Sequence, residues 1–409
     1  MKILHTADWH LGKTLCKRKR YDEFEAFLAW LTLTINEQKV DVLLVAGDVF
    51  DTTAPSNRSQ ELYYCFLRSI ANSSCRHIVI TGGNHDSPTF LNAPKELLQV
   101  LDIHVIGAAC ENLEDEVILL RDSNGHPELI VCAIPYLRDR DIRTAEIGES
   151  IDEKAQKLHQ GTLNHYTRVC ELAEEKRIAL DINIPIVAMG HLFTAGGQTI
   201  EGDGVRDLHV GSLAHVNPAV FPKCIDYLAL GHLHVPQKVG GSEFMRYSGS
   251  PIPMGFGEAY QKKSVCLVEF NDGQPQVKLI EIPVFQQLER IRGTIQEIEQ
   301  RITELSANNS NAWLDIAYSG DEVINNLQDR LKTMISETKM ELLSCKNERL
   351  VAAILSKSRV DETLDDLNVN EVFERFLAVN QIPVDQHPML VTAYREAVLS
   401  LQEEDFRAL

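Results

Sequence analysis

The sequence has no apolar run of the roughly 18 residues needed to cross a bilayer. Its first residues, MKILHTADWHLGK, meet charge too early for a secretory signal peptide. The nine cysteines are scattered and never spaced as CxxC, so neither a disulfide framework nor a zinc ribbon is predicted. Internal repeats and low-complexity tracts are also missing. These absences favour a packed fold in the cytoplasm.

Positive charge is in short supply as well. The 40 lysines and arginines face 59 acidic residues, which gives a formal net charge of −19. The basic surface that usually marks an autonomous nucleic-acid binder is therefore not expected. A metal enzyme that acts on phosphates remains compatible with this balance, because bound cations can reverse the local charge.

Short apolar runs that end in small residues are the main pattern of the first 283 residues. They are ILHTA, VDVLLVAG, HIVITGG, IPIVAMG and DYLALG. Runs rich in Val, Ile and Leu are typical of strands that are buried on both faces. Between the first two runs, apolar residues recur with helical spacing on one face: Phe24, Phe27, Leu28, Leu31 and Ile35. Alternating strands and helices predict a layered α/β domain.

The composition predicts three parts. Residues 1–283 form the layered domain, with a charged helical insertion at 139–180. Residues 284–360 alternate strand-like and helix-like segments and are expected to form a small α+β domain. Residues 361–409 carry a net charge of −8 and show two amphipathic helical patterns separated by prolines. With 409 residues, two or three domains are also the ordinary expectation.

Polar side chains follow each of the five apolar runs directly. They are Asp8, His10, Asp48, Asn84, His191, His232 and His234. Since the carboxyl ends of strands collect at one edge of such a sheet, these groups can converge. Seven donors are too many for one ion and suit two ions that share a carboxylate. Nitrogen and oxygen donors without thiolate favour Mn²⁺, Fe or Zn²⁺.

Each piece of this constellation has a simpler alternative. A single histidine after a strand is more often structural, Asp48 is placed where a helix cap could stand, and Asn84 suits a turn. Five buried strand ends that all carry polar groups would be costly to desolvate without a shared partner. The joint interpretation as a metal site is therefore favoured.

The arrangement DxH, GDxxD, GNHD, GH, GHxH resembles the calcineurin-like metallophosphoesterases. The resemblance implies a layered β-sandwich flanked by helices, with Asp48 shared between two ions. It assigns one ion to Asp8, His10, Asp48 and His234, and the other to Asp48, Asn84, His191 and His232. His85 resembles the acid that stabilises the transition state or protonates the leaving oxygen. Asp51 resembles the carboxylate that orients His85.

Longer matching segments identify a narrower family than these short motifs do. HTADWHLGKTL, AGDVFDTTAPSNRSQELYY, TGGNHDSP and VGSLAHVNPAVFPKCIDYLALGHLHVPQ closely resemble the SbcD family, the nuclease subunits of SbcC–SbcD complexes. The resemblance implies a Mn²⁺-dependent, ATP-regulated 3′→5′ double-strand exonuclease and single-strand endonuclease. Such an enzyme cleaves hairpins and processes DNA ends in recombination, replication and repair, by two-metal hydroxide attack on the phosphodiester. It also implies homodimerisation within the complex.

The partner implied by the resemblance is SbcC, a long coiled-coil ATPase. No Walker A motif occurs in this sequence, so ATP binding is expected on the partner. The resemblance also implies that 284–360 is a capping domain and that 361–409 is a helical hairpin. This hairpin is expected to dock on the partner, and packing against the rest of the chain is the alternative. A basic cluster after the first strand is a candidate DNA contact, with a solvated charged face as its alternative: Lys13, Lys17, Arg18, Lys19 and Arg20.

Two other functions fit parts of the pattern. A calcineurin-like phosphodiesterase or phosphatase for a small molecule or phosphoprotein needs the same ions but not the C-terminal parts. A DNA-end scaffold that has lost its chemistry is the second alternative, which the complete donor set and His85 oppose.

Overall fold

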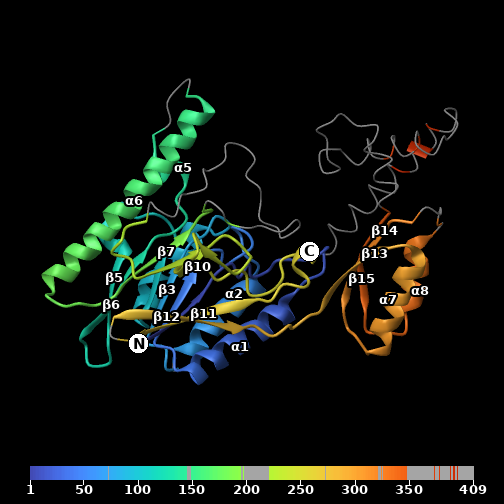
Figure 1. Ribbon diagram of the computed structural model, residues 1–409, viewed down its shortest axis with the longest axis horizontal. Coiled ribbons are helices and arrows are strands. Elements are labelled where there is room, and N and C mark those ends of the chain that lie inside the picture. The colour runs from blue at the N-terminus through green and yellow to red at the C-terminus, as the bar shows by residue number, and fades with distance from the viewer. Residues whose placement is uncertain are drawn as a thin grey trace. The chain divides into compact units, whose positions relative to one another are not determined.

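The computed structural model describes residues 1–71, 73–144, 149–194, 197, 221–271, 273–320, 324 and 326–347, and the single positions 373, 377, 387, 390, 391 and 394. The chain divides into two compact units, Met1–Gln286 and Gln287–Leu409 (Figure 1). Apart from those single positions, the predicted segment 361–409 lies outside the described residues.

The first unit contains two six-stranded sheets. The first sheet has the order β12 (Gln274–Glu281), β11 (Ser264–Asn271), β1 (Lys2–Thr6), β2 (Val42–Ala46), β3 (His77–Thr81), β4 (Ile103–Ile106). The second has the order β5 (Val117–Arg121), β6 (Pro127–Ala133), β7 (Ile186–His191), β8 (Tyr227–Gly231), β10 (Ser242–Tyr247), β9 (Gln237–Val239). Neighbouring strands from β1 to β4 are parallel, as are β6, β7 and β8. The five predicted apolar runs form β1, β2, β3, β7 and β8.

The two sheets pack face to face around an apolar core. Leu44 and Val79 of the first sheet and Val131 and Val187 of the second belong to this core and are fully buried. The opposite face of each sheet is covered by helices, so the central strands are buried on both sides. This double burial is why their sequences read as continuous apolar runs rather than as alternating patterns.

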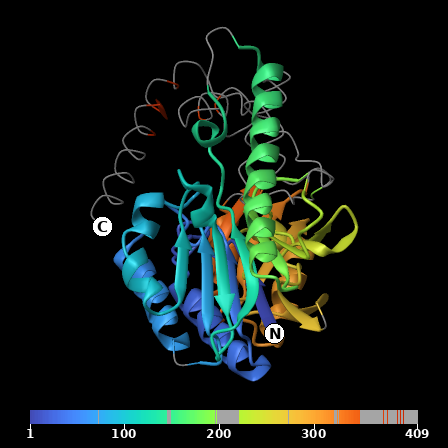
Figure 2. The same cartoon turned by 90° about the vertical axis from the view of Figure 1, so that its left-hand side faces the viewer.

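Helices complete the layers (Figure 1, Figure 2). The first sheet packs against α1 (Tyr21–Gln38) and α2 (Asn57–Ile70), and α1 buries the predicted face with Phe24, Phe27 and Leu31. The second sheet packs against α6 (Ile151–Ala179), the long green helix. The predicted layered β-sandwich flanked by helices is therefore confirmed.

The predicted insertion at 139–180 is helical. It contains α5 (Asp139–Ile142) and α6, and a capping box between Ser150 and Glu153 fixes the start of α6. The described residues of this unit also contain the short helices α3 (Pro88–Asn92), α4 (Lys95–Gln99), η1 (Leu113–Glu116) and η3 (Phe256–Glu258). Among the described residues, no helix combines the length and the apolar character required for a membrane span.

Over residues 287–347, the described part of the second unit contains a three-stranded sheet and two helices. Its elements are β13 (Leu288–Gly293), α7 (Ile295–Ala307), β14 (Trp313–Tyr318), α8 (Leu327–Ile335) and β15 (Glu341–Asn347). The strands lie in chain order and are parallel, and Ile298, Ile316 and Leu331 share one core. Strands and helices alternate here, so the unit consists of βαβ units rather than of separated strands and helices as in an α+β fold.

Candidate metal centre

The predicted donor residues lie at the carboxyl ends of five parallel strands. In the first sheet, Asp8 follows β1, Asp48 follows β2 and Asn84 follows β3. In the second sheet, His191 ends β7 and His232 follows β8. Because the two sheets face each other, the site receives side chains from both of them.

One group of donors contains Asp8, His10 and His234, which offer ligand atoms that all lie within 4.8 Å of one another. The Nε2 atoms of His10 and His234 are 3.2 Å apart. Oδ2 of Asp48 is 3.5 Å from Nε2 of His10, so Asp48 adjoins this group. All four side chains are buried.

The second group surrounds the amide oxygen of Asn84. This oxygen is 2.9 Å from Nε2 of His191 and 3.0 Å from Nδ1 of His232. Oδ2 of Asp48 is 3.3 Å from Nε2 of His191. The same Asp48 oxygen thus approaches both groups, which is the position of a carboxylate shared between two ions.

The imidazole orientations test whether cations fit here. Nδ1 of His10 faces Oδ1 of Asp51 at 3.4 Å, and Nδ1 of His234 faces Oε1 of Glu258 at 3.5 Å. A facing carboxylate favours the tautomer with the proton on Nδ1, although at these distances neither Nδ1 of His10 nor Oε1 of Glu258 makes a hydrogen bond in the described part of the chain. The two Nε2 atoms therefore direct lone pairs toward each other across 3.2 Å. A cation satisfies both lone pairs, and carboxylate partners on the far nitrogens are typical of metal-binding histidines.

The electrostatics of the centre also suit cations. Burial and neighbouring histidines lower the pKa of His232 to about 3, and burial lowers that of His10 to about 4, so both rings are neutral. Burial opposes ionisation of Asp48, but His191 holds its pKa below the usual range. Burial likewise opposes protonation of His191, yet Asp48 raises its pKa to about 9. A proton on His191 thus balances Asp48, and a bound cation would replace that proton.

The backbone at the donors is strained. Asp8, His10 and Asp48 have φ values of 53°, 47° and 51°, and His232 has 102°. Residues with side chains rarely adopt this left-handed region, at a cost of about 1–3 kcal/mol each, and such residues cluster at functional sites. A Cβ on Gly83 would collide with the Asp48 carboxylate. Glycine at this position therefore allows close approach of the two loops.

His85 lies beside the donors but is held differently. Its Nδ1 is 2.8 Å from the main-chain carbonyl of Asp51, and its ring stands edge-on to His10 with centroids 4.8 Å apart. Because a carbonyl only accepts, Nδ1 carries a proton and Nε2 is the nitrogen that can gain or lose one. The group that orients His85 is thus the carbonyl of Asp51. The carboxylate, predicted for this role, instead contacts His10 and the Lys13 ammonium, the latter at 3.1 Å.

Asp86 is a structural residue that the sequence pattern did not reveal. Its fully buried carboxylate accepts hydrogen bonds from the backbone N–H groups of Val49 (3.1 Å), Phe50 (2.9 Å) and Gly83 (2.9 Å). It therefore ties the loop after β2 to the loop after β3. Its place beside His85 in GNHD was the available signal.

Glu258 is the second residue of this kind. Besides facing His234, its carboxylate pairs with the buried Lys263 ammonium, which also donates to the His234 carbonyl at 3.0 Å. Glu258 belongs to η3, which follows the fifth donor strand by more than 20 residues. Nothing in the spacing of the donors points to it.

The basic cluster after β1 divides into two kinds of residue. Lys17, Arg18 and Lys19 are exposed. Arg20 is only 2 % exposed, and its guanidinium binds Glu23 and the Pro253 carbonyl. The prediction of a DNA contact for Arg20 is therefore wrong, because its charge is used inside the fold.

Comparisons with protein families agree with this architecture. The family model described as calcineurin-like phosphoesterase matches residues 1–236, and one described as type 5 capsule protein repressor C-terminal domain matches residues 284–381. The chain belongs to the calcineurin-like phosphoesterases and is a hydrolase. Cations at the site just described are consistent with that class.

Curated relatives narrow the assignment. The chain is 34 % identical over 407 residues, 99 % of both chains, to the SbcD subunit of the nuclease SbcCD of Escherichia coli K12. It is 38 % identical over 281 residues, 67 % of each chain, to the protein of that name in Rhodobacter capsulatus. The Bacillus subtilis protein of that name is 33 % identical over 275 residues, again 67 % of each chain. Within the phosphoesterases, the chain thus belongs to the SbcD family.

Proposed function

We propose that this chain is the nuclease subunit of an SbcC–SbcD-type complex. It would cleave DNA phosphodiesters, as a 3′→5′ exonuclease on double strands and an endonuclease on single strands and hairpins. The observation that carries the proposal is the convergence of seven donor side chains from both sheets, with the Asp48 carboxylate between two groups. The names of the relatives support DNA as the substrate.

Two divalent ions, preferentially Mn²⁺, are proposed as cofactors. One would be held by Asp8, His10, Asp48 and His234, and the other by Asp48, Asn84, His191 and His232. When bound, they would supply a nucleophilic water at neutral pH and charge stabilisation at phosphorus. The chain itself contributes seven donor side chains with little access to solvent. Asn84 and His232 are half-buried, and the other five are buried.

His85 is proposed as the catalytic acid. The carbonyl of Asp51 fixes its ring and keeps the proton on Nδ1, so Nε2 is available to the departing oxygen. From there it can donate a proton or a charged hydrogen bond as negative charge develops. The carboxylate of Asp51 acts one step further away, by orienting His10.

The remaining proposals concern partners. The SbcC-type ATPase would supply ATP regulation and much of the DNA grip, consistent with a net charge of −19. The exposed Lys17, Arg18 and Lys19 would contact phosphates beside the centre, with Lys13 at its edge. Homodimerisation within the complex and a cytoplasmic location stay predictions.

The replacement His85→Gln tests the proposal. With Mn²⁺ and an end-labelled hairpin duplex, we expect cleavage to fall about 10²- to 10⁴-fold, the usual contribution of a positioned acid. Bound metal, measured by mass spectrometry of the dialysed protein, should be unchanged. The matched control is His126→Gln, since His126 is an exposed histidine on a turn. Cleavage at the full rate by the His85 variant would remove this residue from the mechanism.

The substrate class needs a separate experiment. Bis-p-nitrophenyl phosphate, a phosphoprotein and duplex DNA are compared with Mn²⁺, Mg²⁺ and Zn²⁺, with and without the partner ATPase and ATP. Preferential, ATP-dependent cleavage of DNA ends is expected. Rapid turnover of a phosphoprotein or small diester, with no DNA cleavage in the presence of the partner, would favour the phosphatase alternative.

A further inference from the structure

A second cluster of metal-binding side chains lies at the opposite end of the strands that carry the metal centre. His77 is the first residue of β3, and Asp102 and His104 lie at the start of β4. They offer ligand atoms that all lie within 4.8 Å of one another. The donors of the metal centre follow the carboxyl ends of the strands, so the two clusters are separated by the length of the sheet.

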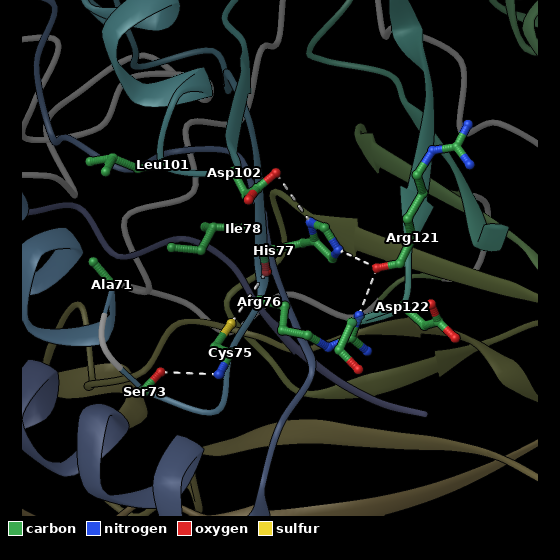
Figure 3. A pocket seen from close by; sticks show the side chains of 11 residues that line it. Ala71, Ser73, Cys75, Arg76, His77, Ile78, Leu101, Asp102, Arg121 and Asp122 are labelled. Atoms are coloured by element: carbon green, nitrogen blue, oxygen red, sulfur yellow. Dashed lines mark hydrogen bonds and ion pairs between the residues drawn. The ribbon is translucent and has the colours of Figure 1, made fainter. Parts of the chain in front are cut away.

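The orientation of His77 leaves one nitrogen aimed at this cluster. Its Nε2 lies 2.8 Å from the Arg121 carbonyl at the end of β5. Figure 3 marks this contact with a dashed line. Because that oxygen only accepts, Nε2 carries the proton and Nδ1 has a lone pair. Nδ1 is buried, has no hydrogen-bond partner and is 3.8 Å from Oδ1 of Asp102. A buried acceptor without a donor is costly, and a cation between it and the carboxylate would remove that cost.

His104 supplies the third donor. It pairs in register with Val79, two residues beyond His77, so both histidine side chains lie on the same face of the sheet. Burial lowers the pKa of His104, and the neighbouring His77 lowers it further, so its ring is neutral and keeps a lone pair. The cluster therefore offers two imidazole nitrogens and one carboxylate.

A cavity beside His77 leaves room for further ligands. It has a volume of about 500 Å³, and Asp102, Asp122 and Ser73 are among its lining residues. Arg76 also lines this cavity and is a cationic group that could repel an ion. Its guanidinium is already paired with Asp41 at 3.1 Å and with Glu128 at 2.7 Å, so its charge is balanced. Water molecules in the cavity can complete the coordination of an ion.

We propose that His77, Asp102 and His104 form a second, mononuclear site for a zinc-class divalent ion. Two imidazoles and one carboxylate with an open position are a known zinc set, with ligand distances of about 2.0–2.2 Å. Donors on one such ion stand roughly 3.3 Å apart in a tetrahedral site. The Asp102 side chain, 65 % exposed, can rotate to close the present 3.8 Å gap.

The site would stabilise the contact between the two sheets. His77 joins β3 of the first sheet to the Arg121 carbonyl of the second sheet through its Nε2–H. An ion on Nδ1 fixes the ring and strengthens that hydrogen bond, because a metal-bound imidazole is a better donor. Zinc bound here would therefore stabilise the sandwich at the edge farthest from the catalytic ions.

The test counts ions on the full-length, untagged protein. After equilibrium dialysis against zinc, we expect wild type to hold one more ion per chain than His104→Gln and than Asp102→Asn. The control His159→Gln changes a histidine on α6 and should match wild type. Two variants are used because either alone could shift the local fold, which circular dichroism would reveal. Equal zinc content in wild type and both variants would overturn the proposal.

A second readout separates this site from the metal centre. With cobalt as the probe, the visible absorption of wild type minus His104→Gln should contain a band from a site with nitrogen and oxygen ligands. Zinc should also raise the unfolding temperature of wild type more than that of either variant. Nuclease activity with Mn²⁺ should stay the same in His104→Gln. Identical cobalt spectra and identical zinc-induced shifts would contradict the site, whatever the nuclease assay shows.

Discussion

At the scale of single residues, the groups behind the donors are as informative as the donors themselves. The carboxylate of Glu258 faces Nδ1 of His234 and forms an ion pair with the Lys263 ammonium. We expect Glu258→Gln to weaken metal binding or activity by about 10- to 100-fold, the usual cost of losing such a partner. Isothermal titration with Mn²⁺ and hydrolysis of bis-p-nitrophenyl phosphate measure the two quantities.

The matched control for this change is Glu281→Gln. Glu281 also pairs with a lysine, Lys262, but both side chains are largely exposed. It should therefore leave metal affinity and hydrolysis unchanged. If Glu258→Gln bound Mn²⁺ as tightly as the control, Glu258 would have no part in positioning His234.

His5 gives a prediction about acid stability. It is fully buried between the sheets, with Nδ1 3.0 Å from the Tyr227 hydroxyl, and burial lowers its pKa to about 3. The unfolded chain takes up a proton near pH 6.5, whereas the folded chain does not until about pH 3. The folded state is thus disfavoured as the pH falls through this window, by about 1.4 kcal/mol per pH unit.

Urea unfolding of chelated protein between pH 6.5 and pH 4 measures this effect. The unfolding free energy of wild type should fall more steeply with decreasing pH than that of His5→Leu. The difference in slope should correspond to about one proton taken up per chain on unfolding. Parallel slopes for wild type and His5→Leu would show that His5 is protonated in the folded chain.

The donor side chains could be predicted from the sequence, but the groups that orient them could not. Asp8, His10 and Asn84 stand directly after apolar runs, and strand ends gather by topology, so their convergence was predictable. The positive φ values of Asp8 and His232 could not be inferred, because non-glycine residues rarely adopt them without tertiary support. The carbonyl of Asp51 was equally invisible, since every residue has one.

At the scale of elements, the segment between β1 and α1 joins the catalytic rim to an exposed basic stretch. Replacing Lys17, Arg18 and Lys19 together with alanine should weaken DNA cleavage. It should also reduce the salt slope of binding by roughly one for each lost phosphate contact. Fluorescence anisotropy with labelled duplex over a salt series, with the partner present, measures both.

A charge-matched control is available on α6. Lys154, Lys157 and Arg168 are basic residues that face acidic neighbours there, so replacing them should leave the salt slope unchanged. Should the Lys17–Lys19 variant show wild-type cleavage and the wild-type slope, the segment would be a solvated face only.

Arg20 shows why a run of charges is a poor guide to contacts. It follows three exposed basic residues, yet its side chain turns inward to Glu23 at the start of α1. That reversal depends on Pro253, more than 230 residues away, whose carbonyl receives the guanidinium. Among the strands that the sequence pattern did not predict, two have a weak local signal: β9 is three residues long, and β15 is only half buried and lacks an apolar pattern.

At the scale of the whole molecule, we expect the layered unit and the C-terminal part to have separable roles. Removing residues 361–409 should abolish co-purification with the SbcC-type partner and leave Mn²⁺-dependent hydrolysis of bis-p-nitrophenyl phosphate unchanged. The reason is that all seven donors lie within Met1–Gln286. Co-purification of the truncated chain with the partner would contradict docking through the tail.

Composition and periodicity indicated one domain boundary near residue 284, and the second boundary, predicted between residues 360 and 361, stays a prediction. The change of pattern at residue 284 stands close to the junction of the compact units between Gln286 and Gln287. The parallel order of the small sheet did not follow, because three short strands and two helices can be arranged in several ways. Topology of that kind is decided by packing rather than by local sequence.

Because the donors come from both sheets, substitutions between the sheets should affect metal binding. A defect in the interior, such as a smaller side chain at Val187 or Leu44 between the sheets, changes their spacing and thereby the fit of the ligands. Loss of bound metal should then precede loss of the fold as such variants are warmed. A laboratory screen for inactive alleles would accordingly collect many substitutions that lie nowhere near the chemistry.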